Sequence, residues 1–441
     1  MHSGQKLSYY RIVSSERLQI EVRCSRKAPG VLLGDVQDRT GYRVMLKKSA
    51  IIHLVLVVGM AVLLSATAWA RSSRTSKSSS TQRVTETPRA QKRLARLRHT
   101  RTTMRRHRRY YERFYTSSYA DDITEGDAIA GEDPVVRAAA IEALGNMNGT
   151  VVAIDPDSGR VLTMVNQKVA LAGGAQPCST IKLAVGLAAL NERIVDKNTE
   201  ISLGRRWRMN LTDALAHSNN AYFEALGRRL GFEKVSYYAH EFGLGELAGY
   251  NIPGEHLGVF PSQELAAKAG GVGKMCSFGE SISMTPLQLG AMVAAIANGG
   301  TLYYLQHPSS PEEVAAFQPK IKRQLDIAPL IPSMADGMLG AVQYGTARSL
   351  RYNFSEEPVL GKTGTCSHEG TRFGWFASYA KTDYGRIVVV VFLRGGRPTF
   401  GPKAAEIAGR MYRNLYDHNF FAETADRATR GSGVGTVGVA Q

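Results

Sequence analysis

The 441-residue chain contains little cysteine, and its apolar residues form only one long run. Its four cysteines are too few and too scattered for a disulfide-rich scaffold or a zinc site. The apolar run covers 14 residues, 51–64, so a membrane protein with many spans is excluded. Charged residues make up 21% and hydrophobic residues 44% of the chain. These proportions are typical of globular proteins and exclude a collagen-like or wholly disordered chain.

Acidic residues are scarce in the first quarter of the chain. Residues 71–113 carry 15 Lys or Arg against 2 Asp or Glu, a formal charge of +13, whereas residues 114–441 carry 30 against 32. The net charge of +17 is therefore a property of the N-terminal quarter. It bears on the partners of that segment, and not on the fold or the main activity.

Residues 45–70 have the organisation of an export signal. Met45 and two lysines precede the apolar run, and Ala68-Trp69-Ala70 follows it. We therefore predict that residues 1–70 are an export signal or a membrane anchor, and that residues 1–44 are an extension upstream of the true start. In the anchor interpretation, residues 50–70 form a single inner-membrane helix. Both interpretations place the rest of the chain in the cell envelope, secreted or on the periplasmic face.

The basic segment that follows, 71–148, is predicted to be a disordered linker, because its densest part has high charge and little apolar character. The simplest interpretation of residues 71–113 is a solvated tether. The alternative is adhesion to an anionic surface of the envelope. Export makes nucleic acid an unsuitable partner, so none is expected. A short helix, Pro134–Leu144, is predicted near the end of the linker.

The order of predicted strands and helices from residue 149 to residue 420 indicates an α/β domain of the α+β type. Two strands form a hairpin at its start, two more lie near its end, and helices fill the region between them. This order favours an antiparallel sheet closed by the two ends of the domain, flanked by helices, with an inserted helical lobe. Residues 421–441 are predicted to be a flexible tail. The predicted strands are Thr150–Asp155, Arg160–Val165, Phe373–Tyr379 and Ile387–Leu393, and the predicted helices are Thr180–Asn191, Ala221–Leu230, Glu233–Phe242, Leu287–Asn298 and Lys403–Tyr416.

The first candidate for catalysis is the pair Ser179 and Lys182, spaced by three residues at the start of an apolar helix. This spacing places both side chains on one helix face. A helix that is apolar all round is buried, so Lys182 should be desolvated, which lowers the pKa of a lysine toward the range of a general base. The pair is therefore suited to activating a serine nucleophile.

Two further sets of residues have side chains suited to catalysis or to substrate binding. Ser218 and Asn220 place a hydroxyl and a carboxamide at a helix start, where plain N-capping is the simpler interpretation. Lys362-Thr363-Gly364-Thr365 places an ammonium, two hydroxyls and a glycine on one strand. Such a strand can bind a carboxylate and donate a backbone N–H to an oxyanion, and the glycine lets a ligand approach closely.

In this order, the three sets resemble the Ser-x-x-Lys, Ser-x-Asn and Lys-Thr-Gly motifs of penicillin-binding proteins and active-site-serine β-lactamases. The resemblance covers about residues 149–417 and is closest to the transpeptidase domain of class B penicillin-binding proteins. Three further segments resemble that domain: the hairpin Thr150–Val165, Ser277–Leu289 and the strand Gly374–Tyr379.

The resemblance implies a role for each motif residue. Ser179 would attack a D-Ala carbonyl of a peptidoglycan stem peptide, Lys182 would take its proton, and Ser218 would relay a proton to the leaving D-Ala. β-Lactams would acylate Ser179. Substrate binding would fall to Asn220, Lys362, Thr363, Gly364 and Thr365. The family uses neither a metal nor an organic cofactor, so none is expected.

The sequence departs from the family pattern beside the motifs. Cys178 stands where the family usually has glycine, and Cys366 follows Thr365. The sequence does not place the two thiols within reach of each other, so free thiols are favoured over a disulfide. The segment 166–176 is also shorter than usual, which predicts a reduced cleft wall.

Three other functions stay open at this point. A D,D-carboxypeptidase would use the same residues with water as the acceptor. A class D-like β-lactamase shares two of the motifs, but has an apolar residue where this chain has Asn220. A non-turnover β-lactam-binding protein would be acylated without releasing a product.

Overall fold

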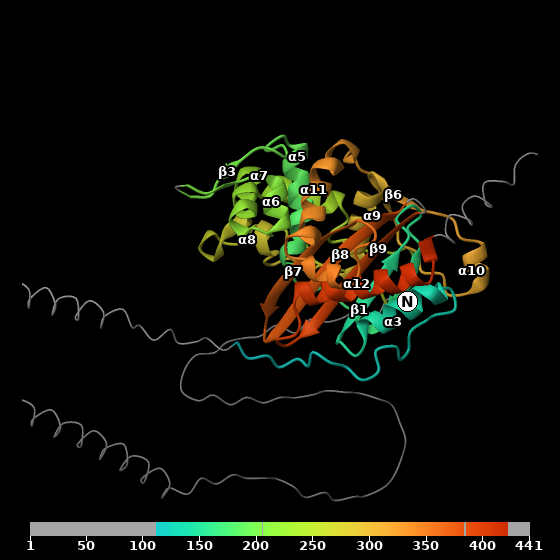
Figure 1. The fold of residues 1–441 in the computed structure, drawn as a ribbon. Helices are drawn as coiled ribbons and strands as arrows, with labels where there is room; N and C mark the ends of the chain where they lie inside the picture. Colours follow the sequence, from blue (N-terminus) through green and yellow to red (C-terminus); the bar gives the residue numbers. More distant parts are fainter. Residues whose placement is uncertain (1–111, 205, 383–384, 422–441) are drawn as a thin grey trace, which may run out of the picture. The chain divides into compact units, whose positions relative to one another are not determined.

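An antiparallel sheet lies at the centre of the described part of the computed structural model, which comprises residues 112–204, 206–382 and 385–421. The strands lie in the order β2-β1-β9-β8-β7 (Figure 1). The two ends of the domain thus share one sheet, as predicted from the sequence, and β7 adds a third C-terminal strand to the two that were predicted. Their bounds are β1 (Gly149–Ile154), β2 (Val161–Val165), β7 (Val359–His368), β8 (Thr371–Thr382) and β9 (Gly385–Gly395).

The two faces of the sheet pack against different helices. Because side chains alternate along a strand, Val152 and Ile154 join one core while Val151 and Ala153 join the other. The first core includes α9 (Pro286–Asn298), and the second includes α3 (Pro134–Leu144) and α12 (Gly401–Asp417). Both faces are therefore covered, which confirms the predicted α+β class.

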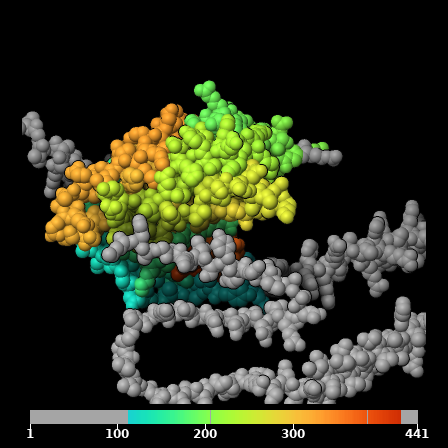
Figure 2. All heavy atoms as spheres, turned by 180° about the vertical axis from the view of Figure 1, so that it is seen from behind, coloured from blue at the N-terminus to red at the C-terminus, as the bar shows by residue number. Residues whose placement is uncertain are grey.

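A helical lobe is inserted between β2 and β7, as predicted (Figure 1), and Figure 2 shows the green and yellow residues of this part of the chain gathered together. It contains α5 (Lys182–Asn191), α6 (Leu211–Ala216), α7 (Asn220–Glu241), α8 (Gly271–Phe278) and α11 (Ile331–Gln343). The backbone of α7 is broken at Gly231, which separates the two helical patterns that the sequence predicted on either side. The sequence analysis did not predict α6, α8 or α11.

Short elements connect these parts. They are α4 (Gln167–Ala170), η1 (Cys178–Ile181), β3 (Ile201–Ser202), β4 (Arg208–Met209), η2 (Ala267–Ala269), β5 (Thr301–Tyr303), α10 (Pro311–Ala315), β6 (Ile321–Gln324), η3 (Ala328–Leu330) and η4 (Arg348–Tyr352). The β5–β6 hairpin is tied to the lobe by Glu246, whose carboxylate lies 2.8 Å from Lys322 Nζ and 2.6 Å from Arg323 Nη2.

The segment 112–148 belongs to the fold, which corrects the prediction that the disordered linker extends to residue 148. The carboxylate of Glu132 accepts hydrogen bonds from the backbone N–H of Met164 on β2 at 2.8 Å and from Arg137 at 2.7 Å. It also accepts from Thr163 Oγ1 at 2.7 Å and lies 3.0 Å from His307 Nε2. These bonds and the buried face of α3 fix the segment against the sheet.

Several predictions fall outside the described residues: the export segment 1–70, the linker up to residue 111 and the tail from residue 422. Phe421, predicted to begin the tail, is buried in the core beside α12. None of the helices within the described ranges combines the length and the apolar character of a membrane span.

Candidate active site

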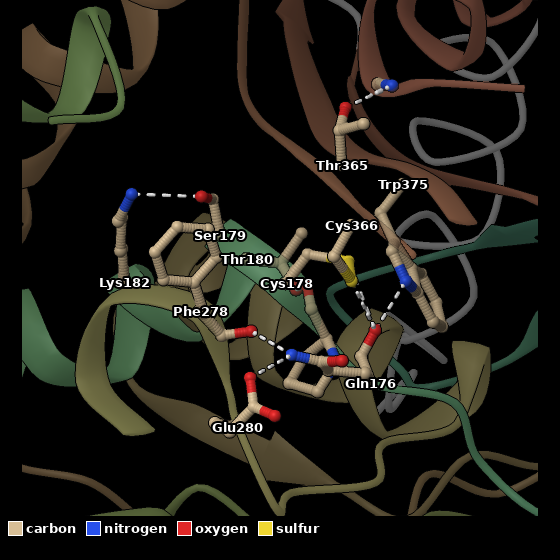
Figure 3. The surroundings of a disulfide bond; sticks show 12 residues. Gln176, Cys178, Ser179, Thr180, Lys182, Phe278, Glu280, Thr365, Cys366 and Trp375 are labelled. Atoms are coloured by element: carbon tan, nitrogen blue, oxygen red, sulfur yellow. Dashed lines mark hydrogen bonds between the residues drawn. A yellow bond between two sulfur atoms is a disulfide. The ribbon is translucent and has the colours of Figure 1, made fainter. Parts of the chain in front are cut away.

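Ser179 and Lys182 meet at the entry to α5. A 3-10 turn, η1, carries Ser179, and Lys182 is the first residue of α5. Because residues i and i+3 are eclipsed in a 3-10 turn, Lys182 Nζ donates to Ser179 Oγ at 2.9 Å (Figure 3). Lys182 is fully buried, whereas Ser179 retains 9% exposure. The predicted pair is therefore in hydrogen-bond contact.

Ser218 and Asn220 lie on the other side of Lys182. Its Nζ donates to the backbone oxygen of Ser218 at 2.8 Å and to Asn220 Oδ1 at 2.6 Å, and lies 3.1 Å from Ser218 Oγ. The N-cap of α7 is Asn219, whose side chain accepts from the N–H of Tyr222. Capping is thus performed by the middle residue of the motif, and the two outer residues face the lysine.

The Lys362–Thr365 strand, part of β7, completes the group. Lys362 Nζ donates to Ser218 Oγ at 2.8 Å, so this hydroxyl lies between two amines. Thr363 Oγ1 lies 2.6 Å from Thr346 Oγ1, and Thr365 Oγ1 accepts from the N–H of Gly401 at 2.8 Å. All three predicted sets therefore converge on one place.

Burial controls the electrostatics of the two amines. It holds the pKa of Lys182 well below its usual range, and the positive charge of Lys362 lowers it further. Burial also lowers the pKa of Lys362, to about 7. Among the described residues, no carboxylate lies within ion-pair distance of either amine. A neutral Lys182 can accept the proton of the Ser179 hydroxyl.

A cleft of about 680 Å³ opens onto this group. Its walls include five of the predicted site residues: Ser179, Ser218, Asn220, Thr363 and Thr365. Neither lysine lines the cleft, since both lie behind these hydroxyls. Gly364 does not line the cleft either. A Cβ on Gly364 would lie 2.9 Å from Pro177 O, so this glycine packs against the chain at the η1 turn and does not face the cleft.

The comparison with known families matches residues 149–416 to the penicillin-binding protein transpeptidase domain, over more than half of the chain. The chain belongs to this family. The match begins at β1 and ends within α12, so it covers the whole sheet and the lobe of the transpeptidase domain described above.

Two curated relatives illustrate the range of the family. Stage V sporulation protein D of Bacillus subtilis is 28% identical over 316 residues, covering 60% of this chain and 48% of that protein. Peptidoglycan D,D-transpeptidase MrdA of Acinetobacter baumannii is 26% identical over 370 residues, covering 66% and 54%. The chain spans about half the length of these curated relatives.

Solved transpeptidase domains share the fold. The D,D-transpeptidase domain of a peptidoglycan glycosyltransferase from Eggerthella lenta superposes with a TM-score of 0.54 at 20% identity, covering 65% of this chain and 82% of that one. Penicillin-binding protein A from M. tuberculosis, solved as an imipenem acyl-enzyme complex, gives a TM-score of 0.55 at 19% identity, covering 64% and 78%. At these identities the likeness is one of fold.

A disulfide joins Cys178 and Cys366 in this transpeptidase domain, with their Cα atoms 5.5 Å apart (Figure 3). The sequence analysis favoured free thiols, and that prediction is wrong. The cause is the close approach of β7 to the η1 turn at Gly364, where the missing side chain leaves room for Pro177 and Thr180. The signal for this disulfide in the sequence was that each of the two cysteines directly adjoins a motif residue.

Sequence analysis missed other residues of the cleft. Thr346 bonds Thr363, and the cations Arg348 and Arg372 line the cleft. No motif includes them. The tight hairpin between β7 and β8 could have been used to predict that Arg372 lies near the cleft, because the register of the hairpin sets Arg372 opposite Ser367. No group of three or more metal-ligating side chains occurs within the described ranges.

Proposed function

We propose that the chain is a serine D,D-transpeptidase that acts on peptidoglycan stem peptides in the cell envelope. The observation that carries this proposal is the 2.9 Å contact between Ser179 Oγ and the buried amine of Lys182, opposite the strand of Lys362. The family match and the similarity to a peptidoglycan D,D-transpeptidase support it.

Acylation begins at Ser179. Its Oγ attacks the penultimate D-Ala carbonyl carbon while neutral Lys182 takes the hydroxyl proton. The C–N bond then breaks, and the leaving amine of D-Ala receives a proton. Ser218 is placed to relay it, because its Oγ lies within 3.1 Å of both amines. The product of this half-reaction is an ester on Ser179.

Residues on the two walls of the cleft bind the substrate. The amine of Lys362 lies behind the cleft wall and has a pKa near 7, and the negative charge of a substrate carboxylate in the cleft favours its ammonium form. Thr363 and Thr365 offer hydroxyls to the same carboxylate. Because Asn220 Oδ1 accepts from Lys182, the amide nitrogen of Asn220 is left to donate to a substrate carbonyl.

Stabilisation of the oxyanion requires two N–H donors. The family resemblance assigns them to Ser179 and Thr365. This assignment is compatible with the sheet, because β7 is an edge strand and half of its backbone groups face away from β8. The N–H of Ser179 lies at the start of the η1 turn, where no carbonyl of that turn can accept it.

Release of the ester needs an acceptor, which in a transpeptidase is an amine of a second stem peptide. Water would be activated by a nearby carboxylate. The one acid among the cleft-lining residues is Glu406, which lies 2.8 Å from Lys403 Nζ and is also paired with Arg410. Hydrolysis of a penicilloyl ester should therefore be slow.

The test uses fluorescent penicillin on the purified protein. Covalent labelling that maps to Ser179 and disappears in Ser179→Ala, with the thermal transition retained, supports the assignment. An adduct on another residue contradicts it. Incubation with peptidoglycan fragments then distinguishes the functions by mass spectrometry: cross-linked dimers indicate a transpeptidase, tetrapeptides a carboxypeptidase, and no product a binding protein. Rapid turnover of benzylpenicillin would indicate a β-lactamase.

Residues 71–113 are proposed to tether the domain within the envelope, and their charge of +13 suits an anionic surface. Deleting them should leave penicillin acylation intact. If the segment adheres to such a surface, the deletion should release the protein as high salt does, because salt screens exposed charges beyond about 8–10 Å. Retention in high salt would contradict adhesion.

A further inference from the structure

The Cys178–Cys366 disulfide adjoins a proposed site residue on each of the two cleft walls. Cys178 directly precedes Ser179, and Cys366 directly follows Thr365. The bond therefore connects the residue before the proposed nucleophile to the residue after the proposed carboxylate site. These neighbours are 188 positions apart in the sequence.

The backbone at Cys178 has φ 53°, in the left-handed region. Glycine adopts this region without steric cost, whereas a residue with a Cβ does not. The resemblance implies that the family usually has glycine here, whereas this chain has a residue with a Cβ in the same strained region. A cross-link on the strained residue itself can hold that conformation.

Other ties between the η1 turn and β7 are few. Within the described residues, no backbone hydrogen bond joins residues 176–181 to β7. The indole Nε1–H of Trp375, a residue of β8, donates a hydrogen bond to the carbonyl oxygen of Gln176 at 3.0 Å. Both disulfide sulfurs also lie beside this oxygen (Figure 3). No side chain caps the turn. The disulfide is thus the covalent tie between the two walls.

We propose that this disulfide is a positioning device for acylation: it keeps the backbone of Cys178 left-handed and fixes Ser179 relative to the Lys362–Thr365 strand. The inference rests on the proposed function. Small displacements of a reacting group can cost about 10²-fold in rate, whereas noncovalent recognition by several groups is less sensitive. Opening the bond should therefore slow acylation more than it weakens binding.

The experiment measures penicillin acylation as a function of penicillin concentration, which separates the acylation rate constant from the dissociation constant of the noncovalent complex. In Cys366→Ser we expect the rate constant to fall at least about tenfold, with the dissociation constant changed by less than about threefold. Cys276→Ala removes a buried free thiol of α8 and should change neither.

A second arm opens the same bond without mutation. Dithiothreitol reduces the disulfide to two thiols and is itself oxidised to a cyclic disulfide. The reduced protein should acylate as slowly as Cys366→Ser, and removal of the reductant with reoxidation should restore the rate. Reduction should not affect Cys366→Ser itself.

The outcomes separate the two proposals. A wild-type protein that penicillin does not label contradicts the proposed function. Wild-type labelling with an equally fast Cys366→Ser variant contradicts only the positioning role. Loss of the folded state on reduction, or a change confined to the dissociation constant, would show a structural or binding role and would also overturn it.

Discussion

Two clusters of charged side chains are buried in this domain, and they are built in opposite ways. At the edge of the sheet, the carboxylates of Asp127 and Glu132 pair with Arg137, at 2.9 and 2.7 Å. In the cleft, the amines of Lys182 and Lys362 share the hydroxyl of Ser218 and have no carboxylate partner among the described residues. The first cluster joins opposite charges, and the second joins like charges.

The difference shows in the pKa values. Burial alone would raise the pKa of Glu132, but hydrogen bonds from His307, Thr163 and Arg137 outweigh it and hold the pKa below its usual value. In the cleft, the charge of Glu224 opposes burial at Lys182 but does not outweigh it, so both lysines have lowered pKa values. A paired cluster stabilises ionised groups, and an unpaired one provides a neutral amine, which is a base.

The largest effect is expected when the cleft cluster loses its base. Lys182→Ala should slow penicillin acylation about 10²- to 10⁴-fold, the usual scale for a general base. Noncovalent binding should persist, because the carboxylate site is intact. Lys168→Ala, which removes an exposed lysine, is the control. Stopped-flow labelling measures the rate, and wild-type kinetics in Lys182→Ala would refute the assignment.

Breaking the paired cluster should cost stability and not chemistry. Glu132→Gln leaves Arg137 with one partner and should lower the free energy of unfolding by about 3 kcal/mol. Glu125→Gln breaks an exposed pair with Lys168 and should cost less than about 1 kcal/mol. Urea unfolding compares the two. Equal losses would show that burial does not decide the strength of these pairs.

The electrostatic coupling between the amines of Lys182 and Lys362 predicts that a substitution at Lys362 shifts the pH dependence of acylation. The acylation rate constant at saturating benzylpenicillin should fall as acid protonates Lys182. Because the charge of Lys362 lowers the pKa of Lys182, Lys362→Met should move the midpoint of that fall to higher pH. Lys168→Met should leave it unchanged. A midpoint that stays or moves lower would contradict the coupling.

The last expected effect concerns stability and pH. Lys362 has a pKa near 7 in the folded domain and about 10.4 when unfolded, so between these values the unfolded chain binds more protons. The free energy of unfolding should therefore rise with pH from about 7 to 10 through this group. Denaturant titrations at several pH values should show a smaller rise in Lys362→Met than in the wild type.

The sequence predicted the convergence of the site but not all of its bonds. Ser179 and Lys182 are local neighbours, so helical spacing alone placed them. The strands of the sheet followed from alternating and apolar runs. The disulfide was signalled only indirectly, by two cysteines that each adjoin a motif residue. The Glu132 cluster depends on which segments the tertiary fold brings together, and local patterns carry no such information. The place of Arg348 beside the cleft was invisible for the same reason.

The order of the strands also has a consequence for how the domain folds. β1 pairs with β9, with Val152 opposite Val390, so the centre of the sheet joins residues that are far apart in the chain. Closing such a long loop is slow, and high contact order slows folding. Until β9 arrives, the β1–β2 hairpin exposes an unpaired edge that can bind other chains. The nascent protein is therefore most vulnerable to aggregation just before its last strands are complete.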